Sequence, residues 1–297
     1  MTLPLTLEWL GVTTFRVRIG RLTLFFDTFV DRIATAPPSG LRSARIREAD
    51  YIFISHAHLD HILGADTVAL NTGAPVIGSH ETIRVMRENG VPEEQHWAVS
   101  GGETIECASG VTVRVLPALH ACLWAESSPD ASVCCAGDLG VHYRETRERT
   151  ARAVRKLHSL TPEVETYLAG YDGRASRSDG GQLNYLLSTE QGSILFSSSA
   201  GYWTAIMREL RPDVALLAVS GRPNVDGEPF QGSLAQFIAA QVELLSPRVV
   251  ALTHHDEWMP PLPAVDVAPV VEELARRSPS VRVAELAIAK PVAILAG

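Results

Sequence analysis

Short hydrophobic runs separated by turn residues open the chain. Residues 5–10, 14–19 and 22–26 have the length and composition of β-strands, and a Gly-Arg pair between the last two predicts a tight turn. The next run, residues 51–54, is continuously apolar rather than alternating. That pattern is typical of a strand buried on both faces.

Later runs predict further strands, several of them paired in hairpins. They lie at residues 75–78, 103–107, 111–118, 183–188, 193–198, 214–219, 249–253, 281–287 and 292–295. Helices are predicted at residues 80–89, 143–158, 234–245 and 270–277. Ser79 and Ser233 stand where helix N-caps are expected, and Pro247 prevents the third helix from continuing. Strands and helices alternate with hairpins between them, which favours mixed sheets. We expect one domain over residues 1–297, with an insertion at about 121–180.

Composition limits the class of protein. The chain has 297 residues, 46 % of them hydrophobic, so it can bury a core without disulfides. Its net charge of −8 argues against a nucleic-acid surface, which usually needs a basic patch. The four cysteines show no framework spacing, as in a protein with reduced thiols. We find no signal peptide and no apolar run of the roughly 18–20 residues that a membrane span needs. We therefore expect a cytoplasmic protein.

Three imidazoles and a carboxylate follow the buried run at residues 51–54 directly. They are His56, His58, Asp60 and His61. Imidazole and carboxylate are the usual ligands of zinc and related divalent ions. In an extended turn His56 and His58 can both reach one ion, whereas Asp60 and His61 point to a second position nearby. This spacing predicts a metal site.

The histidine cluster resembles the HxHxDH signature of the metallo-β-lactamase superfamily. Residues 8–29 also resemble the opening strands of its ascorbate-6-phosphate lactonase and N-acylphosphatidylethanolamine phospholipase branches, in which a strand ending in Asp, here Asp27, precedes the metal loop. The resemblance covers nearly the whole chain. It implies an α/β fold: a four-layer αβ/βα sandwich with two mixed β-sheets and the metals at one edge between them.

The resemblance also implies histidine ligands after two later strands. His120, which follows the run at 111–118, is expected to join His56 and His58, although a capping role is the alternative. The doublet after residues 249–253 offers His254 or His255, and the position of the strand end favours His254. Surface positions are expected for His80, His96, His142 and His158.

One position departs from the pattern of the superfamily. A carboxylate that bridges two metals is expected after the run at 193–198, and Ser198 or Ser199 stands there instead. Serine is a poor ligand for a divalent cation, so the second metal is expected to bind more weakly. In the superfamily this carboxylate typically stands in a Gly-Asp pair. Asp138, which follows Gly137, is therefore the alternative bridging residue, although the order of the strands favours the serine region.

Two further segments have candidate roles at the site. Residues 220–229 follow a buried strand, where binding loops are often found, and the sequence leaves open a substrate contact or a purely structural turn. Trp258, with Pro260 and Pro261, is expected to form an apolar wall beside His254.

The resemblance implies a metal-dependent hydrolase that acts on an ester, lactone or amide of a small molecule. A metal-bound water, with its pKa lowered toward about 7, would attack the substrate, and Asp60 would orient that water. One or two Zn²⁺ ions are expected, and Mn²⁺ or Fe also suits such ligands. The alternatives are a phosphodiesterase or nuclease, and a metal-binding protein without turnover. A flavodiiron oxidoreductase is disfavoured because the chain has no flavodoxin-like extension. The oligomeric state stays open.

Overall fold

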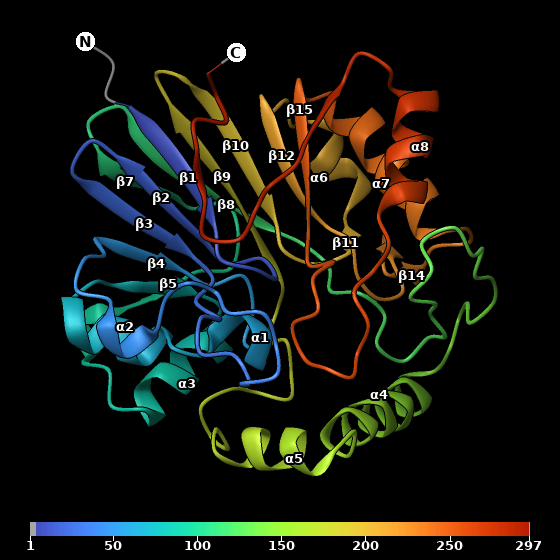
Figure 1. Ribbon diagram of the computed structural model, residues 1–297, viewed down its shortest axis with the longest axis horizontal. Helices are drawn as coiled ribbons and strands as arrows, with labels where there is room; N and C mark the ends of the chain where they lie inside the picture. Colours follow the sequence, from blue (N-terminus) through green and yellow to red (C-terminus); the bar gives the residue numbers. More distant parts are fainter. Residues whose placement is uncertain (1–3, 297) are drawn as a thin grey trace.

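Two seven-stranded β-sheets face each other in the computed structural model, which describes residues 4–296 (Figure 1). The first sheet has the strand order β17 (Pro291–Val292), β1 (Leu5–Trp9), β2 (Phe15–Ile19), β3 (Leu22–Phe26), β4 (Tyr51–Phe53), β5 (Val76–Gly78) and β6 (His96–Ala98). The second has the order β16 (Arg282–Ala284), β15 (Val249–Thr253), β12 (Val214–Ala218), β10 (Gly192–Ser197), β9 (Leu183–Thr189), β8 (Val111–Pro117) and β7 (Thr104–Ala108). Both contain parallel and antiparallel pairs, so both are mixed. A small third sheet is formed by β11 (Gly201–Tyr202), β13 (Asn224–Val225) and β14 (Glu228–Pro229).

The main core lies between the two large sheets. Along β2 the buried positions alternate, with Phe15, Val17 and Ile19 facing inward, because successive strand side chains point to opposite faces. The ring of Phe26 on β3 stacks on the ring of Phe196 on β10, with 3.7 Å between the centroids. Aromatic side chains therefore join the two sheets directly.

Helices cover the outer faces of both sheets. On the first sheet these are α1 (Leu59–Ile62), α2 (Ala65–Thr72) and α3 (His80–Glu88), and on the second α6 (Thr204–Arg208), α7 (Leu234–Leu245) and α8 (Ala268–Arg277). Two short 3-10 turns lie at Ser43–Arg45 and Glu93–Gln95. Ser79 caps α3, and Ser233 caps α7 in a capping box with Gln236, as the sequence predicts. The four-layer sandwich is confirmed.

The sequence missed several short elements and misjudged others. Helix α2 and strand β6 were not predicted, and the run at 281–287 forms a strand only over Arg282–Ala284. The last run, at 292–295, pairs only at Pro291–Val292. Both of these strands lie at a sheet edge and have a neighbour on one side, which leaves fewer ladder hydrogen bonds to extend them.

The chain between β8 and β9 lies outside both sheets. It carries α4 (Tyr143–His158) and α5 (Pro162–Ala169), which run along the bottom of the view in Figure 1. Helix α5 was not predicted, although Thr161 as N-cap and Pro162 at the first turn are strong start signals. The single domain and the bounds of its insertion stay predictions. Within residues 4–296, no helix is long and apolar enough to cross a membrane.

Candidate metal centre

Ligand-type side chains gather where strands of both sheets end. His56 follows β4, and His58 is the N-cap residue of the one-turn helix α1, which carries Asp60 and His61. In the second sheet, His120 follows β8 and His254 follows β15. Strands β8 and β15 point the same way, because β8 is antiparallel to β9, β9 to β10, and β10 is parallel to β12 and β12 to β15. Residues far apart in sequence therefore meet at one edge of the sandwich.

His56, His58 and His120 form the first group of potential ligands. One ring nitrogen from each lies within 4.8 Å of the others, and His58 Nδ1 is 3.2 Å from His120 Nε2. His56 is completely buried, and its Nε2 has no hydrogen-bond partner. Burial and the neighbouring imidazoles hold the pKa of His56 well below its ordinary value, and burial beside His120 lowers the pKa of His58 to about 3. These imidazoles are therefore neutral, as metal ligands must be.

Asp60, His61 and His254 form the second group. Asp60 Oδ2 lies 3.4 Å from His61 Nε2 and 3.2 Å from His254 Nε2. Burial acts to raise the pKa of Asp60, but His61 and His254 outweigh it and hold this pKa well below its ordinary value. Burial acts to lower the pKa of His61, but the carboxylates of Asp60 and Asp27 raise it to about 10. This group therefore favours positive charge, which a divalent cation would supply in place of the proton.

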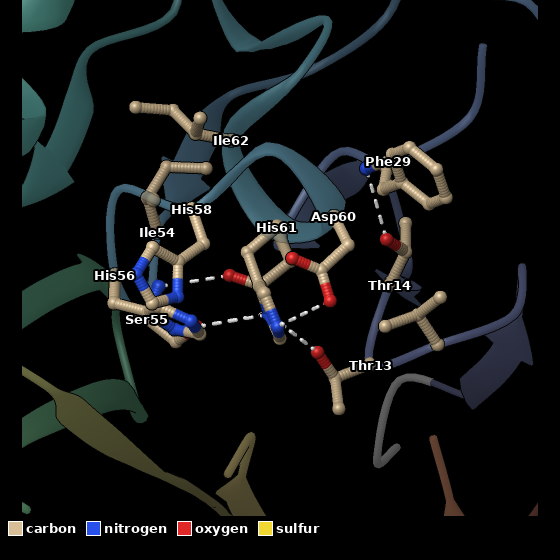
Figure 2. A network of polar contacts seen from close by, with 12 residues as sticks. Thr13, Thr14, Phe29, Ile54, Ser55, His56, His58, Asp60, His61 and Ile62 are labelled. Carbon is tan, nitrogen blue, oxygen red and sulfur yellow. Dashed lines mark hydrogen bonds and ion pairs between the residues drawn. The ribbon is translucent and has the colours of Figure 1, made fainter. Parts of the chain in front are cut away.

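The buried carboxylate of Asp27 orients the ring of His61 through the nitrogen that faces away from Asp60. Asp27 Oδ2 lies 2.8 Å from His61 Nδ1, which leaves Nε2 toward Asp60. Thr13 Oγ1 donates to the same Asp27 oxygen at 2.7 Å, and the Ser55 N–H donates to Asp27 Oδ1 at 2.8 Å. Figure 2 shows Thr13, Ser55 and Asp60 around His61. Such carboxylate partners fix the tautomer and ring orientation of histidine ligands.

The structure distinguishes the two histidines of the 254–255 doublet. His254 belongs to the second group, whereas His255 Nε2 lies 3.2 Å from Leu252 O and its ring packs 5.4 Å from the ring of Trp9. The placement agrees with the preference for His254. His254 has a left-handed backbone, with φ of 60°, and its N–H donates to Val12 O at 2.9 Å.

A buried ion pair supports this turn, and sequence reasoning missed it. Val12 is itself left-handed, with φ of 50°, and donates its N–H to Asp256 Oδ1 at 2.9 Å. Asp256 Oδ2 lies 2.8 Å from Arg32 Nη2, close enough for an ion pair although the angle does not suit a hydrogen bond. The one signal in the sequence that could have indicated this ion pair is the position of Asp256, two residues after His254.

The candidates for the bridging position were Ser198 or Ser199 and, as the alternative, Asp138. Ser198 is buried. Ser199 Oγ accepts the N–H of Ala121 at 3.1 Å, so it holds the loop after His120. Asp138 lies 2.6 Å from Arg149 Nη1 and belongs to neither group. Among the described residues, Asp60 is the carboxylate in these two groups. The structure therefore gives no support to Asp138 as a bridge.

The loop at residues 220–229 serves the site in two ways. Asn224 Nδ2 donates to His120 O at 2.9 Å, and the buried Arg222 donates through Nη1 to Glu126 O at 3.0 Å, so both hold neighbouring loops. Ser220 and Gly221 line the cavity in front of the ligand groups. The sequence left open whether this loop is a structural turn or contacts a substrate. In the structure the loop both holds its neighbours and lines the cavity.

A cavity of about 210 Å³ faces both groups. His58, Asp60, His61, His120 and His254 all line it. Trp258 forms part of its wall, as expected, and packs edge-on against Phe29 with 5.8 Å between ring centroids. Pro260 and Pro261 are not among its lining residues, which corrects that part of the expectation.

The other four histidines divide into two pairs. His80 and His142 are exposed, as expected. The side chain of His96 is only 2 % exposed and lies 3.1 Å from Glu93, and His158 lines the cavity. The surface expectation was therefore wrong for both: His96 begins the edge strand β6 with its side chain buried, and His158 ends the Arg- and Glu-rich helix α4 on the face toward the cavity.

Comparison with known proteins agrees with this architecture. Residues 23–151 match the family described as "Beta-lactamase superfamily domain". A UPF0173 metal-dependent hydrolase of Pyrobaculum calidifontis is 32 % identical over 139 residues, which cover 44 % of this chain and 60 % of that protein. Residues 23–151 are thus similar to that superfamily domain, and the chain as a whole has the metallo-β-lactamase fold. It spans about 60 % of the length of the curated relatives that it first matches.

Other proteins match over most of the chain at lower identity. UPF0173 metal-dependent hydrolase MK1542 of Methanopyrus kandleri is 23 % identical, with 86 % of this chain and 85 % of that protein covered. Igni18, a metallo hydrolase of Ignicoccus hospitalis, has a TM-score of 0.62 at 17 % identity over 97 % of both chains. An isothiocyanate hydrolase from Delia radicum gut bacteria has a TM-score of 0.57 at 10 % identity, with 97 % of this chain and 98 % of that chain covered. These structures share the fold. The likeness to the lactonase and phospholipase branches stays a prediction.

Proposed function

We propose that this protein is a metal-dependent hydrolase that acts on an ester, lactone or amide of a small molecule. The observation that carries the proposal is the pair of ligand groups, His56, His58 and His120 beside Asp60, His61 and His254, of which all but His56 line one cavity. The donor set fits a divalent cation, because five imidazoles and a carboxylate converge and His56 Nε2 is buried without a partner. The relatives named metal-dependent hydrolases support the same class of activity.

The six donors have distinct roles in this proposal. His56, His58 and His120 hold a first ion, and Asp60, His61 and His254 hold a second one when it is present. A bound divalent ion would lower the pKa of a water molecule and polarise the carbonyl oxygen of the substrate. Zn²⁺ is the ion that we propose, and Mn²⁺ or Fe also suits imidazole and carboxylate ligands.

Asp60 carries the acid–base part of the proposed reaction. It stays ionised near neutral pH, because His61 and His254 hold its pKa well below the ordinary value. Its Oδ2 can therefore accept a hydrogen bond from the attacking water and orient it toward the substrate. Asp27 contacts Nδ1 of His61 and fixes the ring, and Nε2 of the same ring contacts Asp60 and helps to keep its carboxylate in place.

Elemental analysis and a panel of chromogenic substrates test the proposal. The purified protein should contain a divalent metal and should hydrolyse an ester, a lactone or an amide. His58→Ala should lose metal and lower kcat/KM by more than the roughly 10–100-fold that is typical of residues behind a ligand. The matched control is His80→Ala, which removes an exposed imidazole on α3 and should change neither quantity.

Three results would change the conclusion. Full activity in metal-free His58→Ala protein would refute a metal-dependent reaction. Hydrolysis of bis(p-nitrophenyl) phosphate alone would favour a phosphodiesterase. A metal-loaded protein that turns over no substrate of the panel would indicate a metal-binding protein without catalysis.

A further inference from the structure

Part of the wall of the cavity, apart from the ligand groups, is built from apolar side chains. Val154 and Leu157 of α4, Leu168 of α5 and Trp258 line it. The volume of about 210 Å³ is below the roughly 300–1,000 Å³ of sites for drug-sized ligands. The enclosed part of the cavity therefore fits a compact group.

This apolar wall is anchored to the body of the protein. Val164 and Leu168 of α5 are buried in a cluster with Ile33 and Met259, and Leu157 and Trp258 pack against that cluster. On α4, Val154 and Leu157 are three residues apart and share a face, whereas Arg155 on another face is exposed. The amphipathic helix thus presents apolar surface to the cavity and charge to solvent.

Besides the ligands, five polar residues line the cavity: His158, Ser176, Arg177, Ser199 and Ser220. Two of them have partners elsewhere. Ser199 Oγ is engaged by the N–H of Ala121, and Ser176 Oγ donates to Glu81. Arg177 and His158 also line the cavity, and Arg177 is largely exposed. A sugar or a nucleotide would leave many of its polar groups without partners against the apolar wall, which costs free energy. An apolar group loses nothing there.

We infer that this cavity binds a compact apolar acyl group, of about four to six carbons, in an uncharged ester or lactone. The inference rests on the proposed function for its chemistry. At about 30 Å³ for each water-sized group, the cavity holds on the order of seven heavy atoms, which is one acyl chain with its carbonyl. In the reaction, the water oxygen bonds to the acyl carbon, the bond from that carbon to the alcohol oxygen breaks, and one proton of the water passes to the alcohol oxygen. An ester gives an acid and an alcohol, and a lactone gives one hydroxy acid. The acid then releases one proton.

The size limit can be measured with p-nitrophenyl esters of increasing length. With the metal-loaded full chain, kcat/KM should be highest for butyrate or hexanoate and fall at least tenfold for acetate and for decanoate, since one methylene in an apolar pocket changes the rate by about 10–200-fold. Leu157→Ala should move the maximum toward longer acyl groups, and Val154→Phe should move it toward acetate. Arg155→Ala, on the solvent side of α4, should leave the profile unchanged.

Binding without turnover separates this inference from the proposed function. Ligand-observed NMR should detect saturable binding of 1-hexanol and none of xylitol, with or without metal. If 1-hexanol binds and Val154→Phe abolishes its binding while no ester, lactone or amide is cleaved, the proposed function fails and the apolar site stands. Ester hydrolysis with no dependence on chain length, or with 1-hexanol unbound, would overturn the inference and leave the hydrolase intact.

Discussion

The buried ion pair between Arg32 and Asp256 should control both stability and the second ligand group. The side chains are 2 % and 8 % exposed, and Arg32 Nη2 lies 2.8 Å from Asp256 Oδ2. The guanidinium occupies the space beside Gly11, where a Cβ would lie 1.6 Å from Arg32 Nη2. Asp256→Asn would leave the buried guanidinium of Arg32 without its carboxylate partner. The new amide side chain would still have an oxygen that can accept the N–H of Val12.

The size of the effect follows from burial and backbone strain. Removing one partner of a buried ion pair costs about 3–5 kcal/mol, because the remaining charge stays desolvated. Left-handed residues other than glycine store on the order of 1–3 kcal/mol each, and two of them, Val12 and His254, are joined by a hydrogen bond in this turn. We therefore expect Asp256→Asn to lower the free energy of unfolding by about 3 kcal/mol or more. Asp256→Ala should cost more, since it also removes the acceptor of the Val12 N–H.

Urea unfolding and metal titration provide the two measurements. Asp256→Asn should lower the urea concentration at the unfolding midpoint. It should also lower the affinity for the more weakly bound ion by about 10–100-fold, which is typical when a residue that supports a metal ligand is lost. The control is Glu88→Gln, which breaks the exposed ion pair with Arg84 and should change both quantities far less. Arg32→Met with Asp256→Leu replaces the pair by apolar groups and should recover much of the stability. If Asp256→Asn unfolds no more readily than the control and keeps its metal, the reasoning is refuted.

Two further predictions concern the ligand groups. One of the two variants Ser198→Asp and Ser199→Asp should raise the metal content toward two ions per chain. The reason is that Asp60 is the one carboxylate in the two groups that can offset the charge of two cations. Two tightly bound ions in the unmodified protein would contradict this. Asp27→Asn should weaken metal binding by about 10–100-fold through loss of its contact with His61 Nδ1. Asp66→Asn, which alters a buried carboxylate paired with Arg174, is the control, and equal metal loss in both variants would show that Asp27 has no specific role.

Local pattern accounts for most of what the sequence predicted. The continuous apolar run before His56 and the caps of α3 and α7 are signals within a few residues, and all of them appear in the structure. The resemblance supplied His120 and His254, and the structure places both with the expected partners. Their role as ligands stays a prediction.

Interactions between distant segments could not be read from the sequence. Arg32 and Asp256 are 224 positions apart and meet only when the two sheets pack, and Ser199 finds Ala121 in the same way. The apolar wall was missed for a related reason. Helix α4 is so rich in Arg and Glu that Val154 and Leu157 indicate nothing until α5 is present beside them.

The backbone around the second group explains why its support is so extensive. Asp27 and His254 both follow strands directly, and both have left-handed backbones, with φ of 55° and 60°. Each strand must turn sharply at its last residue if the side chain is to reach the shared edge, and glycine, which tolerates that turn best, has no side chain to offer. The strain is therefore the consequence of placing a functional side chain at the turn. Thr13 and Ser55 donate hydrogen bonds to the side chain of Asp27, and the N–H of His254 donates to Val12 O. These hydrogen bonds therefore hold the two residues whose left-handed backbone is unfavourable by itself.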